Sequence, residues 1–246
     1  MSLKPVIQNP LTKQEIKDLV QFLSYHLGYV PQKMPNMVFA KTAKQYAELY
    51  GGYKIKAEEK IDEINRDTPA FFDHLTDTVV FQGFSYVDGV EVPQFFIPMG
   101  TVIHELIHFF QYATGTFGTY RIFYEGTNEL LSCFLIDDFS IDYRYETQYA
   151  FNIIMEINGH NFWDAIQWMR TFTLHSAKNR FVHRSLKQCP AFSKYSPKKL
   201  LTILDDEDDL LRLQRIENEE TRNIITRYSL RHIINTSKKH RNIIQV

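Results

Sequence analysis

Close to the N-terminus, apolar residues recur every three or four positions, a spacing that predicts one buried face of a helix. Thr12 and Glu15 are placed as a capping box at its start, and Gly28 follows the last apolar position as a helix-ending residue. An amphipathic helix is therefore expected between these signals. Its apolar face consists of Ile16, Leu19, Val20, Leu23 and Leu27.

Shorter elements are expected in the next part of the chain. Residues 37–40 and 53–55 are rich in residues that favour strands, whereas residues 42–50 and 57–64 are predicted as helices.

The strongest β pattern follows. Residues 78–82 and 90–96 flank Asp88-Gly89, a favoured two-residue hairpin turn. Pro93 lacks a backbone donor, so the second run suits an edge strand. These features predict a small antiparallel sheet, and an exposed edge of such a sheet can pair with an extended peptide.

Helical periodicity dominates the rest of the chain. An apolar helix is expected to begin at Gly100 or Thr101 and to end at Gly115, and the acidic run 205–209 suits the first turn of a helix. The expected fold is α+β and predominantly helical, with a main domain over residues 1–158 and a helical extension over residues 159–246. Further helices are predicted at 122–138, 145–157 and 162–174, and the chain from about residue 181 is expected to be mostly helical.

Composition excludes several classes of protein. The net charge is −1 with 23% charged residues, so no nucleic-acid partner is expected. The sequence has no run of 18 apolar residues, so no membrane span is expected. Its first residues lack the apolar core of a signal peptide. Cys133 and Cys189 do not form a disulfide framework. We therefore expect a soluble, cytoplasmic protein, whose oligomeric state the sequence does not indicate.

The apolar helix after residue 100 contains the pattern H-E-x-x-H. Because a helix turns once every 3.6 residues, His104 and His108 project from the same face. Two imidazoles so placed can chelate one zinc ion, with Glu105 beside the water that the ion would activate. The alternative is a pair of core histidines and a glutamate that find other partners.

A catalytic zinc usually takes three protein ligands, and the next predicted helix supplies two candidates. Glu125 and Glu129 are four residues apart and so share a helix face. The segment between His108 and Glu125 is long enough to finish one helix, turn and return antiparallel. Spacing alone leaves both glutamates open as the third ligand.

Over about residues 99–133 the chain resembles the gluzincin metallopeptidases, in which H-E-x-x-H is followed by a glutamate on the next helix. In several of these families Gly follows the ligand glutamate, as Gly126 follows Glu125 here. The resemblance implies a zincin-like fold, one Zn²⁺ bound by His104, His108 and Glu125, Glu105 as general base and Glu129 as a supporting acid. A competing thermolysin-type alignment makes Glu129 the ligand, but it places Cys133 where that family has an acid, so Glu125 is preferred.

Hydrolysis also needs a donor to the developing oxyanion. In gluzincins a Tyr or His downstream of the third ligand often serves, and Tyr145 is the candidate chosen over Tyr143, Tyr149 and His160. The predicted function is zinc-dependent cleavage of a peptide bond in a peptide or protein substrate. The alternatives are a catalytically silent binding protein that keeps the scaffold, and a zinc hydrolase that acts on another amide.

Overall fold

In the part of the chain that the structure describes, strands and helices alternate up to residue 51, five strands follow one another over residues 70–98, and the rest is helical. The computed structural model describes residues 6–8, 11–51, 69–94, 96–116, 120–136, 143–206 and 209–240. These contain a majority of helical residues and small sheets, which confirms the predominantly helical α+β class. The predicted strand at 53–55 and helix at 57–64 lie outside the described residues.

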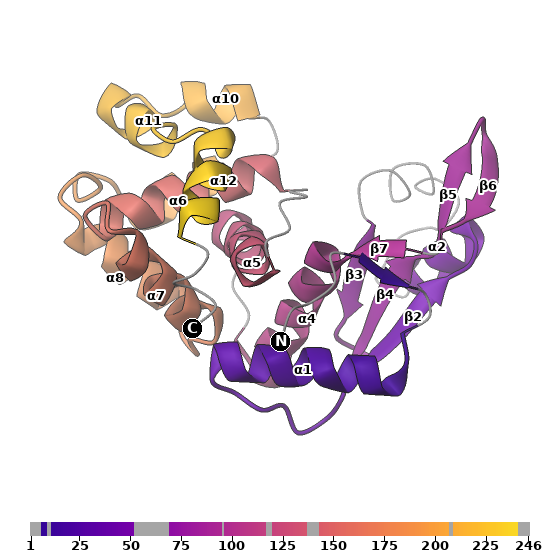
Figure 1. The fold of residues 1–246 in the computed structure, drawn as a ribbon. Coiled ribbons are helices and arrows are strands. Elements are labelled where there is room, and N and C mark those ends of the chain that lie inside the picture. The colour runs from indigo at the N-terminus through magenta and orange to yellow at the C-terminus, as the bar shows by residue number, and fades with distance from the viewer. Residues whose placement is uncertain are drawn as a thin grey trace. The chain divides into compact units, whose positions relative to one another are not determined.

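Two compact units make up the fold, Met1–Ala113 and Thr114–Val246. Their boundary lies between Ala113 and Thr114, whereas the domain boundary expected from the sequence lies after residue 158. In Figure 1 the first unit contains the strands, and the second is built from helices alone among its described residues.

Helix α1 (Lys13–Leu27) begins the first unit at the predicted capping box. The Thr12 backbone N–H donates to Glu15 Oε2 at 2.8 Å, and the Glu15 backbone N–H donates to Thr12 Oγ1 at 3.2 Å. Gly28 ends the helix in the left-handed region at a φ of 69°, where glycine is favoured. The helix therefore starts and stops where the sequence predicted, with Leu19, Val20 and Leu23 buried.

The first unit contains a three-stranded sheet. It is formed by β2 (Asn36–Ala40), β3 (Ala70–Asp73) and β4 (Thr78–Gln82) in the order β2-β4-β3. Strand β4 is parallel to β2 and antiparallel to β3, so the sheet is mixed rather than purely antiparallel. Helix α2 (Ala43–Gly51) adds the buried Tyr46, whose ring contacts Phe71 edge-on with centroids 5.5 Å apart.

The predicted hairpin forms with a different first strand. Strand β5 (Phe84–Val87) pairs with β6 (Val90–Pro93) around Asp88 and Gly89, which have φ values of 51° and 77°. The prediction that residues 78–82 pair with 90–96 was wrong, because both edges of β4 are taken by β2 and β3. Pro93 ends a strand of a two-stranded sheet, which is the edge environment that its missing donor favours.

The run 90–96 is also divided. A separate strand, β7 (Phe96–Pro98), pairs antiparallel with β1 (Val6–Gln8). Helix α4 (Met99–Ala113) follows β7 directly, so it begins one or two residues before the predicted start. Twelve of its fifteen residues are buried, which makes it the core helix of the first unit.

The helices of the second unit follow the sequence prediction closely. Helices α5 (Arg121–Ile136), α6 (Arg144–Ile157) and α7 (Phe162–Thr173) coincide with the three predicted segments within one or two residues. The side chain of Asn161 caps α7 by accepting from the backbone N–H groups of Trp163 and Asp164. The remaining helices are α8 (Lys178–Gln188), α9 (Pro197–Leu204), α10 (Asp209–Gln214), α11 (Glu219–Ile225) and α12 (Leu230–Lys239).

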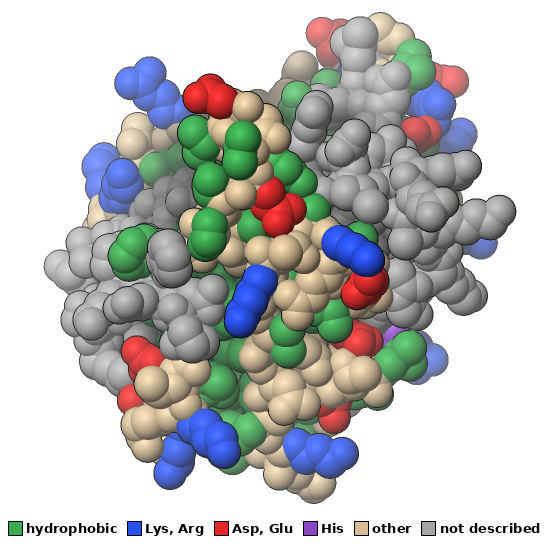
Figure 2. Space-filling model, turned by 90° about the vertical axis from the view of Figure 1, so that its right-hand side faces the viewer, with side chains coloured by type: hydrophobic (Ala, Val, Ile, Leu, Met, Phe, Trp, Pro, Cys, Tyr) green, Lys and Arg blue, Asp and Glu red, His purple; other side chains and the backbone are tan. Residues whose placement is uncertain are grey.

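The surface carries charges of both signs. On the face drawn in Figure 2, the described Lys and Arg side chains are interspersed with Asp and Glu. Within the described part of the chain, no helix has both the length and the apolar character needed to cross a bilayer. The two cysteines, Cys133 and Cys189, are both free and buried.

Candidate metal centre

Helix α4 brings His104 and His108 together by its local geometry. The two residues are one turn apart, and their Nε2 atoms lie 3.1 Å from each other. Two zinc–nitrogen bonds of about 2.0 Å at a tetrahedral angle place the bonded nitrogens about 3.3 Å apart. The histidine pair is therefore already spaced to chelate one metal ion, with no need for a change in the helix.

The pair lies deep in the protein. His104 is 2% exposed, His108 is 8% exposed and Glu105, between them, is 6% exposed. Polar side chains at this depth cost free energy unless a partner replaces water, and one metal ion would satisfy both imidazoles. The rest of this part of the helix is fully buried and aliphatic, formed by Val102, Ile103, Leu106 and Ile107.

A third candidate ligand belongs to helix α5. Among the described residues, the group of His, Cys, Asp or Glu side chains that could hold a metal ion consists of His104, His108 and Glu125. Glu129, one turn further along α5, is 4% exposed and is not part of that group. The roles of Glu125 as ligand and Glu129 as supporting acid stay predictions, as does that of Glu105 as base.

Gly126 lets α5 lie against α6. A Cβ atom placed on Gly126 would lie 2.6 Å from the carbonyl carbon of Glu146 and 2.9 Å from Cβ of Ala150, both on α6. These separations are too short for real atoms, so only glycine allows the observed approach of the two backbones. The glycine after Glu125 thus has a packing role, independent of any metal chemistry.

Replacing Gly126 with alanine is expected to destabilise the protein by about 1 to 3 kcal/mol. A loss of stability would be informative, because replacing glycine with alanine inside a helix normally stabilises it by about 1 kcal/mol. Urea unfolding followed by circular dichroism measures the change. The double variant Gly126→Ala/Ala150→Gly is the control: it should not recover stability, because the obstructing group is the Glu146 backbone. Full recovery would show that the Ala150 side chain, and not the backbone, sets the helix spacing.

The start of α5 is capped from a distant part of the chain. A carboxylate oxygen of Asp205, at 2.8 Å, accepts a hydrogen bond from the backbone N–H of Ile122. Burial raises the pKa of Asp205 to about 6, and the hydrogen bonds from Ile122 and Arg121 oppose this shift. The acidic run was predicted to begin a helix, and α10 does begin at Asp209, but Asp205 follows α9 and caps α5 instead. Its charge complements the helix dipole of the element that carries Glu125.

Tyr145, the predicted oxyanion donor, lies in the first turn of α6. It is 50% exposed, its ring centroid is 6.4 Å from that of Tyr149, and the Arg212 guanidinium carbon lies 5.9 Å from its ring. Tyr143 precedes the same helix and has Arg121 over its ring at 5.7 Å. The role of oxyanion donor stays a prediction for Tyr145.

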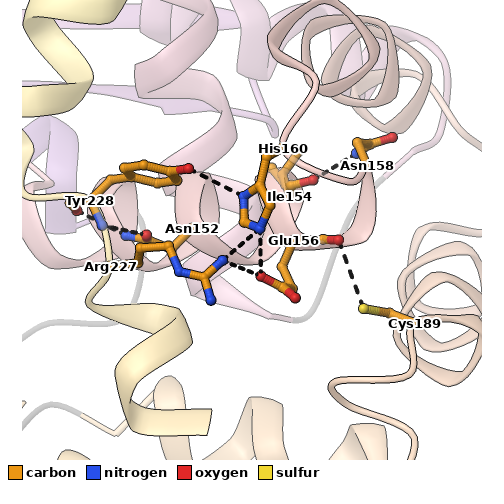
Figure 3. A network of polar contacts seen from close by, with 8 residues as sticks. All are labelled: Asn152, Ile154, Glu156, Asn158, His160, Cys189, Arg227 and Tyr228. Atoms are coloured by element: carbon orange, nitrogen blue, oxygen red, sulfur yellow. Dashed lines mark hydrogen bonds and ion pairs between the residues drawn. The ribbon is translucent and has the colours of Figure 1, made fainter. Parts of the chain in front are cut away.

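His160 is engaged elsewhere, in a polar network at the end of α6 (Figure 3). Its Nε2 lies 2.6 Å from an Arg227 nitrogen and 3.2 Å from Glu156 Oε2, and its Nδ1 lies 3.2 Å from Tyr228 Oη. Arg227 also forms an ion pair with Glu156 at 2.7 Å. These contacts use both ring nitrogens, so His160 joins the end of α6 to the segment before α12.

Sequence reasoning missed two features with chemical potential. Lys178 is 2% exposed, and no sequence pattern around it predicts that a lysine is buried there. A pocket in the first unit includes Asp77 and Tyr112, which come from separate elements and have no shared motif. The only signal in the sequence was the aspartate-rich turn 73–77, which is also typical of an ordinary loop.

Comparison with known proteins adds no family to these observations. No protein-family model matches the chain, and no curated protein and no solved structure matches it either. The residues of the site therefore carry the functional argument by themselves.

Proposed function

We propose that this protein is a zinc-dependent peptidase of the gluzincin type. The observation that carries the proposal is the buried pair of His104 and His108, with Nε2 atoms 3.1 Å apart, on the helix that also holds Glu105. A metal site without catalysis has no need of a carboxylate in this position, whereas a hydrolase does. The gluzincin resemblance of residues 99–133 gives the same assignment.

The donor set suits zinc. Two imidazole nitrogens and one carboxylate oxygen are ligands that catalytic zinc sites use, with a fourth position left for water. We assign His104, His108 and Glu125 as the ligands. Glu129 is proposed to accept a hydrogen bond from the second nitrogen of a ligating histidine, an interaction that fixes the ring and raises its basicity.

Glu105 carries the proton transfers. A bound zinc ion would supply a water of lowered pKa and polarise the scissile carbonyl. The Glu105 carboxylate would act as the base that accepts a proton from the attacking water, and it would then deliver that proton to the leaving amine. Tyr145 is proposed to donate to the oxygen that develops negative charge. The substrate is a peptide or protein.

Metal analysis tests the ligand set. The purified wild-type protein, loaded with zinc and dialysed, is expected to retain one zinc ion per chain by elemental analysis. Removing a ligand lowers zinc affinity strongly, so Glu125→Ala should lose the ion on dialysis. Glu129→Ala is the matched variant one turn away: it should keep the ion with affinity lowered about 10- to 100-fold, as for the loss of a supporting group.

The opposite pattern would transfer the ligand role to Glu129, as the thermolysin-type alignment has it. Equal zinc retention in wild type, Glu125→Ala and a His104→Ala variant would contradict a metal centre at this position. Circular dichroism of each variant separates loss of the ion from loss of the fold.

A further inference from the structure

A pocket of about 460 Å³ lies at the C-terminal end of helix α4, within the first unit. Its volume falls in the range of pockets that hold small ligands or single side chains. Phe109, Tyr112 and Ala113 of α4 form one wall, and Tyr29 and Lys33, from the segment after α1, form another. Asp77, in the turn before β4, adds a carboxylate.

Three of these side chains are aromatic and are held in place from behind. Tyr29 Oη donates to the carbonyl oxygen of Ala113 at 3.3 Å, and its ring meets Phe110 with centroids 6.3 Å apart. Phe109 and Tyr112 both pack against Phe72, at 5.9 and 5.8 Å between ring centroids. Three aromatic side chains with fixed neighbours thus line the pocket, and the face of an aromatic ring attracts an organic cation through its quadrupole.

Two further sources of negative potential face the same space. The Asp77 side chain is 30% exposed, and its backbone has a φ of 51°, held by the hydrogen bond that its carbonyl accepts from the Asn36 N–H at 2.9 Å. Ala113 is the last residue of α4, where the helix dipole places partial negative charge. Aromatic faces, a carboxylate and a helix C-terminus all favour a positively charged guest.

The side chain of Lys33 already forms a weak ion pair with Asp77. Its ammonium group lies 3.9 Å from Asp77 Oδ2, and its side chain is 81% exposed. An ion pair as exposed as this contributes little to stability, because water screens the two charges. A ligand that enters the pocket can therefore displace Lys33 from Asp77 at small cost.

We propose that this pocket binds an alkylguanidinium or alkylammonium group, with the cation at Asp77 and its aliphatic stem against Tyr29, Phe109 and Tyr112. The site goes beyond the proposed peptidase activity and does not depend on it. The same chemistry occurs in an arginine or lysine side chain of a peptide and in a free polyamine-like cation. A peptide source would place a recognition site for basic residues on the helix that carries His104 and His108.

The test is calorimetric binding to the full-length, EDTA-treated protein, so that neither zinc nor activity enters the result. The probe is N-acetyl-L-arginine amide, and N-acetyl-L-citrulline amide is its uncharged equivalent of nearly the same shape. The arginine derivative is expected to bind at least about tenfold more tightly, because a hydrogen bond to a charged group adds about 1.5 kcal/mol or more. Agmatine, run in parallel, distinguishes the sources: tighter binding of the amide indicates a peptide, and tighter binding of agmatine a free cation.

Asp77→Asn should weaken binding of the arginine derivative about tenfold and abolish its advantage over citrulline. Asparagine tolerates the left-handed backbone of this position, so the fold is retained. Asp88→Asn is the matched control, because Asp88 has the same φ of 51° but does not line the pocket. It should bind as the wild type does.

Lys33→Ala changes an exposed side chain and should act in the opposite direction, tightening binding about two- to fivefold by removing the internal competitor. Equal binding of the arginine and citrulline derivatives would overturn the proposal. So would wild-type binding by Asp77→Asn, or no binding of either cation at millimolar concentration. None of these outcomes bears on zinc retention, so failure here is distinguishable from failure of the proposed peptidase.

Discussion

Replacing Glu105 with glutamine is expected to lower peptide hydrolysis by about 10²- to 10⁴-fold while zinc content stays at one ion per chain. The amide has nearly the same shape as the carboxylate, so it fits a position that is only 6% exposed. It cannot accept a proton at neutral pH, however, and the attacking water is left without a base. His104 and His108 on either side of it are unchanged.

The measurement is cleavage of a peptide library, read by mass spectrometry, by wild type and Glu105→Gln at equal zinc content. Glu48→Gln is the control, since Glu48 is an exposed residue of α2 and its loss should leave the rate unchanged. Cleavage by Glu105→Gln at the wild-type rate would contradict the role of Glu105. A zinc-loaded wild type that cleaves no peptide would favour a silent binding protein, and a following screen of non-peptide amides would then test the second alternative.

The second large effect is expected at Lys178, where Lys178→Met should stabilise the protein by roughly 2 to 4 kcal/mol at pH 7. Lys178 begins α8 and is 2% exposed, and its Nζ has no hydrogen-bond partner among the described residues. The Nζ lies 4.9 Å from the Phe172 ring centroid and 5.3 Å from that of Tyr124. These rings offset only part of the cost of removing an ammonium group from water. Methionine fills the same space without a charge.

The pH dependence follows from the direction of the shift. Burial lowers the pKa of Lys178 from 10.5 to about 7. Between about pH 7 and pH 10.5 the unfolded chain therefore holds a proton on this lysine that the folded chain has released. Because the unfolded state binds more protons, stability should rise as the pH increases through this window. Lys178→Met should remove that rise.

Urea unfolding of wild type and variant at several values between pH 7 and pH 10 measures both effects. Lys187→Met, on the exposed side of the same helix, is the matched control and should change stability by less than about 0.5 kcal/mol. A Lys178→Met variant less stable than the wild type at pH 7 would show that the buried amine has a favourable interaction with its surroundings that outweighs its desolvation.

Local signals in the sequence were sufficient for most of the helices. Thr12, Glu15 and Gly28 bound α1 because capping involves atoms only a few residues apart. The pairing of His104 with His108 has the same origin, because a helix fixes the positions of residues one turn apart. The predominantly helical class and the pairing of the two histidines on one helix face could therefore be predicted from local sequence patterns alone.

Strand pairing was decided by tertiary structure. The sequence placed residues 78–82 in a hairpin with residues 90–96. Strand β4 pairs instead with β3, which directly precedes it in the chain, and with β2, which lies far from it in the chain. The alternation of apolar and polar residues and the positions of turn residues identify strands. They carry little information about which strand, distant in the sequence, each one will pair with. The predicted turn at Asp88-Gly89 is present, because a turn depends on neighbouring residues. The strand that precedes it, β5, was not predicted.

The surroundings of the candidate site were likewise set by contacts between distant segments. Asp205 caps α5 across 83 positions of sequence, and Gly126 is required by the Glu146 backbone on the next helix. Lys178 is buried because Tyr124 and Phe172 cover it, which no pattern around residue 178 indicates. The sequence by itself determined the helices and the His104–Glu105–His108 constellation, since both depend on neighbours within one or two turns. The Asp205 cap of α5, close helix contacts, buried charges and the Asp77 pocket depend on groups that only the folded chain brings together.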